Sequence, residues 1–123
     1  MLLINWDGIT TMATITRVLA ELPVDGLRFN DGKTDSKGRL YLGTMISEEL
    51  GEIFDFHKRV GSFYKYTVQG GLVELKKNVG LSNGMAWNDK TNKFYFCDSY
   101  DLNVKEYDFD VKTGTISKYL FKF

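Results

Sequence analysis

The sequence contains one cysteine and one histidine, and these two shortages exclude several kinds of site. Cys97 has no partner for an internal disulfide, and the chain has no Asn-x-Ser/Thr sequon. Both observations agree with a cytoplasmic location. With His57 as the single histidine, a multi-histidine zinc site or a Ser, His and Asp triad has almost no material from which to be built.

The sequence also lacks net charge and long apolar runs. Its 16 basic and 16 acidic residues cancel, so no excess positive charge attracts phosphate backbones or anionic lipid surfaces. No apolar run approaches the roughly 18 to 20 residues that cross a bilayer, and the start MLLINWDG has no basic leader. We therefore expect no nucleic-acid partner, no membrane span and no secretory signal.

Short alternating apolar stretches, by contrast, are abundant. Aromatic residues make up 15% of the chain, and 12 glycines and other turn residues separate the apolar stretches. This pattern predicts an all-β protein, with strands over 2–6, 14–22, 40–45, 62–67, 72–76, 84–88, 93–99, 104–110 and 115–121. A helix is the alternative for 14–22, although its β-branched first half favours a strand. The stretch 46–59 has no period of two and is interpreted as a loop.

Two segments of the chain echo each other. Those beginning at Asn30 and Asn83 each run from an asparagine through a polar turn into an aromatic strand, with an offset of about 53 residues. A period of this size with about four strands per unit is typical of β-propeller blades. Because a blade buries its faces only against neighbouring blades, we expect a chain of about two blades to be an incomplete domain that exposes apolar surface and can self-associate.

The segment RFNDGKTDSKGRLYLGTM over 28–45 resembles the second-blade signature of the regucalcin, gluconolactonase and luciferin-regenerating enzyme family. GSFYKY, NVGLSNGMAWNDKTNKFYFCDS and VKEYDFDVKTGTIS follow in the order of that family. The resemblance covers nearly the whole chain and is strongest to insect members. It implies a partial six-bladed β-propeller and a metal-dependent sugar lactone hydrolase.

The resemblance also implies roles for individual residues. Arg28 and Asn30 match the residues that hold the sugar lactone, Glu48 falls where a further substrate-contacting acid is often found, and Asn83 matches a ligand of the divalent metal, which is calcium, zinc, manganese or magnesium. The glutamate and the aspartate that complete the metal site in the family lie outside this sequence. We therefore expect weak metal binding and no catalytic activity from this chain alone.

The same residues have simpler interpretations when the resemblance is set aside. Asn30 and Asp31 can cap a turn before Gly32, and Asn83 with Gly84 is a common turn dipeptide. Glu48 can equally be a solvated loop carboxylate. For an Arg and Asn pair, the chemistry favours recognition of carboxylate or clustered hydroxyl oxygens.

Other conspicuous residues are interpreted as structural. Cys97 lies within an aromatic strand and is expected to be a small buried apolar side chain, and the aromatic strands are expected to pack blade against blade. Asp98 and Asp101 lack the spacing of a calcium-binding EF-hand loop. The alternative function is a non-catalytic calcium-binding regulatory protein of the regucalcin type.

Overall fold

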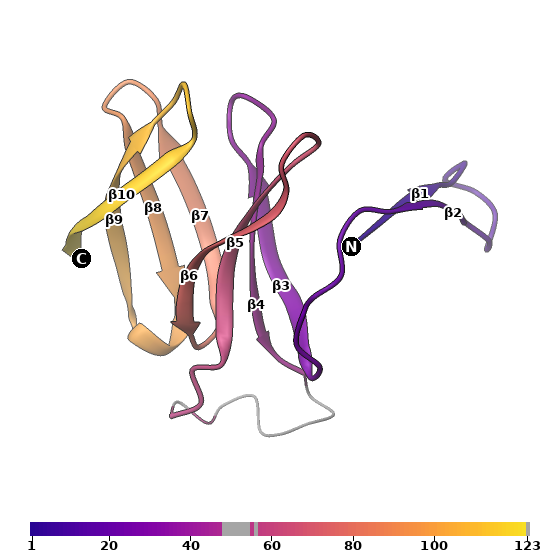
Figure 1. Ribbon diagram of the computed structural model, residues 1–123, viewed down its shortest axis with the longest axis horizontal. Coiled ribbons are helices and arrows are strands. Elements are labelled where there is room, and N and C mark those ends of the chain that lie inside the picture. The colour runs from indigo at the N-terminus through magenta and orange to yellow at the C-terminus, as the bar shows by residue number, and fades with distance from the viewer. Residues whose placement is uncertain (48–54, 56, 123) are drawn as a thin grey trace.

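The strands and their connections are seen in the computed structural model, which describes residues 1–47, 55 and 57–122, the last five by backbone alone (Figure 1). The described residues form ten β-strands and one short 3-10 helix, η2 (Ser99–Asp101). The strands are β1 (Leu2–Asn5), β2 (Thr14–Val18), β3 (Leu27–Thr34), β4 (Leu40–Ile46), β5 (Gly61–Thr67), β6 (Gly71–Val79), β7 (Ser82–Asn88), β8 (Lys93–Asp98), β9 (Asn103–Asp110) and β10 (Thr115–Lys122).

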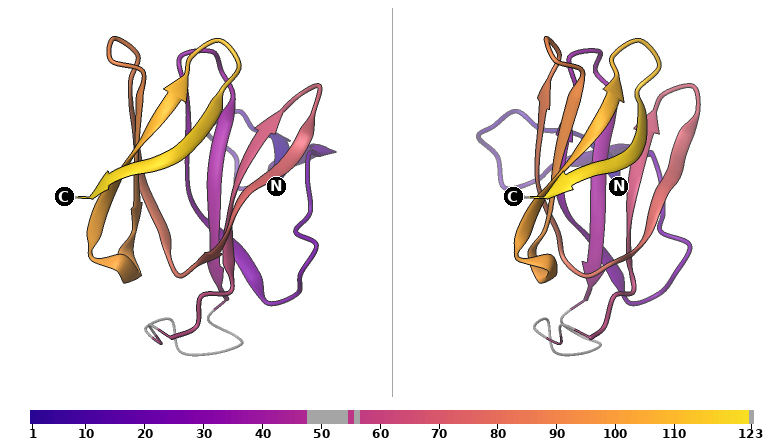
Figure 2. Two further views of the ribbon diagram at one scale, coloured as in Figure 1. Left: turned by 60° about the vertical axis from the view of Figure 1, so that its left-hand side comes forward. Right: turned by 90° about the vertical axis from the view of Figure 1, so that its left-hand side faces the viewer.

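Eight of these strands form two four-stranded antiparallel sheets in which each strand pairs with the next along the chain. We name the sheet β3–β6 blade 1 and the sheet β7–β10 blade 2. The two sheets stand face to face, and their first strands, β3 and β7, are neighbours (Figures 1 and 2). This is the arrangement of consecutive propeller blades, so the expected all-β blade architecture is confirmed.

Most expected strands are present, but the strand β3 (Leu27–Thr34) was missed and the segment 14–22 forms a shorter strand, β2, rather than a helix. Asn30, Asp31 and Gly32 have low intrinsic strand propensity. Their segment is nevertheless extended because β4, which is largely buried, pairs with it from Leu40 to Ile46. Tertiary pairing therefore overrides local preference in β3.

The two asparagines of the internal echo occupy matching irregularities in β3 and β7. In β3 the regular pairing stops at Phe29 and resumes at Gly32, so that Asn30 and Asp31 lie opposite Gly43. In β7 the pairing shifts between Asn83 and Met85. The turn interpretations of Asn30 and Asn83 are therefore wrong: both residues lie at β-bulges, which re-aim side chains at a strand edge.

The turns that connect the strands are capped by side-chain oxygens of Asp and Asn. Asp35 Oδ1 accepts hydrogen bonds from the backbone N–H groups of Lys37 and Arg39 at 2.9 and 3.0 Å. Asn88 and Asp110 cap their own turns in the same way. Since an Asx side chain can replace a backbone acceptor in a tight turn, these residues fix where β4, β8 and β10 begin.

The core lies between the two blades. It consists of aromatic and aliphatic side chains from both sheets: Tyr41, Phe63, Val79, Met85, Phe94, Phe96, Tyr107 and Phe109. The alternating burial of β8 explains this placement, because Phe94 and Phe96 point to blade 1 while Tyr95 and Cys97 point away from it. At the closest approach of the blades, a Cβ atom on Gly43 would lie 1.8 Å from Ser82 Oγ. Only glycine fits there.

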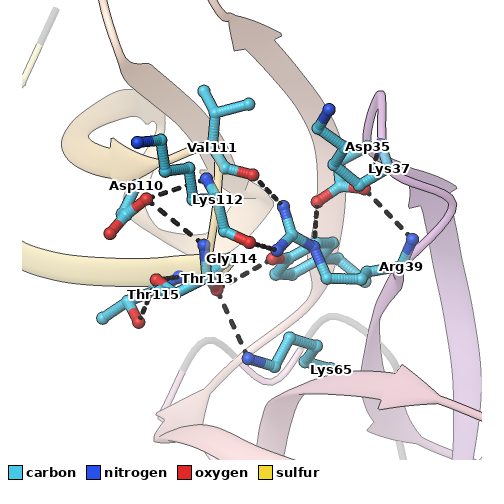
Figure 3. Close-up of polar contacts among 11 residues, drawn as sticks. Asp35, Lys37, Arg39, Lys65, Asp110, Val111, Lys112, Thr113, Gly114 and Thr115 are labelled. Atoms are coloured by element: carbon cyan, nitrogen blue, oxygen red, sulfur yellow. Dashed lines mark hydrogen bonds and ion pairs between the residues drawn. The ribbon is translucent and has the colours of Figure 1, made fainter.

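A polar cluster, drawn in Figure 3, also joins the blades at one end. The Arg39 guanidinium lies 2.6 Å from Asp35 Oδ2 in blade 1 and donates to the carbonyl oxygens of Val111 and Lys112 in blade 2, at 2.7 and 3.0 Å. Beside it, the Tyr41 hydroxyl donates to Gly114 O at 2.9 Å, and burial raises the pKa of this tyrosine. The cluster fixes blade 2 relative to the Asp35 turn.

The β1–β2 hairpin stands apart on the side of blade 1 opposite to blade 2 (Figure 1). Its strands pack chiefly on each other, and every residue in both strands is exposed. The aliphatic side chains are about half exposed; those of 50% or more are Leu2, Leu3, Ile4, Ile15 and Val18. The expected exposure of apolar surface is therefore present, and much of it lies on this hairpin.

In the part of the chain that the structure describes, no helix has the length and apolar character needed to cross a membrane.

Candidate functional site

Three of the four residues expected to form a site lie on the adjacent first strands of the two blades. Arg28 and Asn30 belong to β3 and Asn83 to β7. The Asn30 side-chain N–H donates to the carbonyl oxygen of Ser82 at 2.8 Å. Because Ser82 directly precedes Asn83, this hydrogen bond between blades brings the β3 pair and Asn83 together.

The Arg28 and Asn30 side chains contact each other. An Arg28 guanidinium nitrogen lies 3.4 Å from Asn30 Oδ1 and 3.3 Å from the carbonyl oxygen of Phe29. Arg28 is partly exposed and Asn30 is exposed, so a ligand can reach both. Together they present a planar fork of charged donors beside an amide, a combination that suits carboxylate or clustered hydroxyl oxygens.

The Asn83 side-chain amide forms a hydrogen bond through its nitrogen, and its oxygen is a possible ligand atom. Its Nδ2 donates to Ser99 Oγ at 3.1 Å, and Asn83 is exposed. Oδ1 is the atom of this amide that can contact a cation, because the nitrogen has only N–H donors. An amide oxygen is a ligand type that calcium and magnesium accept.

These residues do not by themselves fit a divalent metal ion. Calcium and magnesium take six or more oxygen ligands and zinc takes about four ligands, whereas Asn83 offers one neutral oxygen. Within the described ranges no group of three or more His, Cys, Asp or Glu side chains is placed to hold a metal. Further oxygens are needed to complete a site around Asn83.

Asp98 fixes the position of the segment that leads into β7. Its carboxylate is buried, and it accepts hydrogen bonds from the backbone N–H groups of Gly80, Leu81 and Tyr100 at 2.9 to 3.1 Å. Arg59 balances the charge, with a guanidinium nitrogen 3.2 Å from Asp98 Oδ2. Charge-assisted bonds to backbone N–H groups are among the stronger hydrogen bonds. Asp98 therefore fixes the backbone position at which β7 starts, with Ser82 and Asn83 as its first residues.

The ion-pair network extends from Asp98 to the surface. Arg59 also lies 2.8 Å from Asp101 Oδ1, and Lys105 forms a second ion pair with Asp101. Burial alone raises the pKa of Asp101, but the hydrogen bonds and charges of Lys105 and Arg59 outweigh burial and hold that pKa below its usual value. Asp98 and Asp101 therefore act as structural anchors of this end of blade 2.

Two results of the sequence analysis need comment here. Glu48 lies outside the described residues, so its predicted contact with substrate stays a prediction. The anchoring role of Asp98 and the link from Asn30 to Ser82 were both missed. A signal for Asp98 was present, since an acidic residue at the end of an aromatic strand must be paired if it is buried.

Comparison with known proteins identifies the family to which this chain is similar. The model of the SMP-30/gluconolactonase/LRE-like region matches residues 3–120. Regucalcin from Sus scrofa is 34% identical over 116 residues, which is 93% of this chain and 36% of that protein. A Bacillus subtilis (strain 168) protein named for a sugar lactone lactonase activity is 36% identical over 93 residues, which is 76% of this chain and 30% of that protein. The chain thus spans about a third of the length of these relatives.

Solved structures give the same result. A luciferin-regenerating enzyme superposes with a TM-score of 0.79 at 32% identity, over 95% of this chain and 38% of the other. A calcium-binding protein, regucalcin from Agrobacterium tumefaciens, superposes with a TM-score of 0.71 at 24% identity, over 95% of this chain and 37% of the other. These matches confirm that blade 1 and blade 2 are part of a six-bladed β-propeller.

Proposed function

Because the chain belongs to the SMP-30/gluconolactonase/LRE-like family, we propose that it supplies one arc of the substrate channel of a divalent-metal-dependent sugar lactone hydrolase. The observation that carries this proposal is the group formed by Arg28, Asn30 and Asn83 on two adjacent strands. Asn30 and Asn83 lie at bulges, Arg28 contacts Asn30, and the hydrogen bond from Asn30 to Ser82 O joins the two strands. The names of the relatives supply the substrate class.

In this proposal, Arg28 and Asn30 bind the sugar lactone and Asn83 binds the cation. The Arg28 guanidinium and the Asn30 amide are suited to orient the ring oxygens of a sugar lactone, because Arg28 carries five N–H donors and the Asn30 amide has a second N–H besides the one that donates to Ser82 O. Asn83 Oδ1 is one of several oxygens that a cation at the channel centre requires. In the whole protein such a cation would polarise the lactone carbonyl and activate water.

We further propose that the chain alone binds the lactone weakly and does not turn it over. One amide oxygen does not hold a hard cation, and the described residues offer no acidic cluster to help it. We extend the proposal to self-association through exposed blade faces and to a cytoplasmic location, which the single cysteine and the absence of sequons support.

Binding and turnover are tested separately. A lactam analogue of the sugar lactone resists hydrolysis and can be titrated into the chain by NMR. We expect saturable shifts, and Arg28→Met and Asn30→Ala should each weaken the binding about tenfold, which corresponds to the loss of one hydrogen bond. Lys33→Met, an exposed change on the same strand, should leave binding unchanged. Absence of binding to the unsubstituted chain would contradict the proposed substrate class.

Acid release from gluconolactone in the presence of manganese, zinc or calcium tests turnover. We expect rates equal to the uncatalysed background. Metal-dependent turnover that Asn83→Ala abolishes would show that the chain is a working enzyme by itself.

The second candidate, a non-catalytic calcium-binding regulatory protein, is favoured by the exposed amide of Asn83 and by the regucalcin relatives. Calorimetric titration with calcium separates the two candidates. Micromolar binding that Asn83→Ala removes would support the regulatory function, whereas the lactone hydrolase proposal predicts only weak binding by this chain.

A further inference from the structure

An apolar cavity lies between the outer halves of the two blades. The blades are closest at their first strands, β3 and β7, and diverge toward their outer strands, β6 and β10. The gap between the diverging sheets is a cavity of about 170 Å³. Its lining residues all belong to blade 1 or blade 2, and none of them is Arg28, Asn30 or Asn83. The cavity is therefore distinct from the group proposed to bind the lactone.

The floor of the cavity is aromatic. It is lined by buried rings from three strands, each at most 8% exposed: Phe63, Phe94, Phe96 and Tyr107. The centroid of the Phe63 ring lies 4.7 Å from that of Phe96 and 5.7 Å from that of Phe94. Rings packed at this spacing form a continuous apolar wall. Such a wall suits a flat apolar group and not the hydroxyl-rich ring of a sugar lactone.

A β-bulge in β6 brings a cation to the mouth of this cavity. The register of β6 against β5 shifts at Leu75, which is an extra residue directly before Lys76. Successive residues of a regular strand point to opposite faces, but a bulge re-aims a side chain. In agreement with this, Leu75 and Lys76 both line the cavity.

The Lys76 ammonium has no ion-pair or hydrogen-bond partner among the residues that the structure describes, and it is exposed. The next residue, Lys77, differs in that it pairs with Glu74 at 3.6 Å. On the side of β10 the cavity is lined by Ile116 and by Ser117, whose hydroxyl can donate a hydrogen bond. A cation and a hydroxyl beside an apolar hollow are complementary to an anion with an apolar body.

The volume of the cavity limits the size of that body. A cavity of roughly 150 Å³ lined by Leu, Ile and Phe can hold one benzene molecule, so a cavity of about 170 Å³ accommodates a single six-membered ring. Side chains that border a void lose van der Waals contacts on that side, and a bound ring restores them. The inner end of the same interface leaves no such space, because only glycine fits at Gly43.

We propose that the cavity is a binding site for a small monocarboxylate with one aromatic ring, of the size of benzoate. The ring packs against the aromatic floor, and the carboxylate lies at the mouth beside Lys76 and Ser117. Because this site shares no residue with the Arg28, Asn30 and Asn83 group, it stands or falls independently of the lactone proposal.

Titration of the 123-residue chain with benzoate, followed by NMR, tests the proposal, and the same titration applies to any longer protein that contains both blades. We expect saturable shifts and intermolecular NOEs from the benzoate ring to the methyl groups of Leu75 and Ile116. Benzyl alcohol has the ring without the charge and should bind about fivefold more weakly, since exposed ion pairs contribute little. Benzylamine, whose ammonium meets that of Lys76, should bind more weakly than the alcohol.

Two substitutions separate the charge from the cavity. Lys76→Met keeps the apolar stem and removes the charge, so it should weaken benzoate about fivefold and leave benzyl alcohol unchanged. Its matched control is Lys77→Met, which removes the neighbouring charge outside the lining and should change neither ligand. Leu75→Trp should fill the cavity and weaken both ligands more than about tenfold, the equivalent of excluding one buried ring. Val68→Trp, in the exposed turn between β5 and β6, should weaken neither.

Circular dichroism shows whether each variant is folded, and the comparison of benzoate with benzylamine needs no variant. The proposal is overturned by any of four results: no saturable benzoate binding to the unsubstituted chain, NOEs only to residues outside the cavity, equal affinity for benzoate and benzylamine, or equal effects of Lys76→Met and Lys77→Met.

Discussion

The Arg39 cluster offers a quantitative test of how the two blades are held together. The Asp35 side chain is 0% exposed, and Arg39 Nε lies 2.6 Å from its Oδ2 while the same guanidinium donates to two carbonyl oxygens of blade 2. Replacing Arg39 by methionine keeps most of the side-chain volume but leaves the Asp35 charge buried without its cation. Breaking a buried ion pair in this way costs about 3–5 kcal/mol.

A second substitution separates charge from packing. In Asp35→Asn combined with Arg39→Met, no charge is left buried, and the Asn side-chain oxygen can still cap the turn toward Lys37 and residue 39. The ion pair disappears together with both of its charges, and the bonds to Val111 O and Lys112 O are lost at about 1 kcal/mol each. We therefore expect the double variant to be more stable than Arg39→Met alone by about 1–3 kcal/mol. Lys37→Met, an exposed change in the same turn, should stay within about 0.5 kcal/mol of the parent.

Urea unfolding followed by tryptophan fluorescence measures these differences. Trp87 packs on Tyr41 and Phe109, with ring centroids 5.2 and 6.2 Å apart, so it reports the contact between the blades. A Trp6→Phe background removes the other tryptophan. All variants are compared at one protein concentration, because association shifts apparent stability. A loss below about 1 kcal/mol for Arg39→Met, or a double variant as unstable as the sum of its singles, would refute this account of the cluster.

Two further predictions follow from close packing and from charge. Gly43→Ala should destabilise the chain by about 1–3 kcal/mol in the same urea assay, because the new Cβ atom would lie 1.8 Å from Ser82 Oγ. Gly84→Ala is the control and should cost almost nothing, because the nearest neighbour of its new Cβ atom lies at 3.7 Å. Equal effects of the two substitutions would contradict this reasoning. The pKa of Asp101 is lowered, so its ion pairs stabilise the fold above the unfolded-state pKa of about 3.9, and this contribution is lost as pH falls through the lower folded-state pKa. Asp101→Asn should therefore flatten the acid side of the profile of unfolding free energy against pH. An unchanged slope would count against the pairing.

The sequence by itself determined the fold class and the residues worth examining. The short aromatic stretch KFYFCD over 93–98 and polar turns such as NDKTN gave the aromatic strands and their boundaries, because short apolar stretches between turn residues are typical of strands. The offset between Asn30 and Asn83 indicated repeated units before any coordinate was known, and the two residues occupy matching bulges.

Only the tertiary structure decided that NDGKT is a strand, that Asn30 donates its amide to Ser82 O, and that Arg39 spans both blades. Each of these depends on a partner some 10 to 70 residues away in the chain, and local propensity carries no information about such a partner.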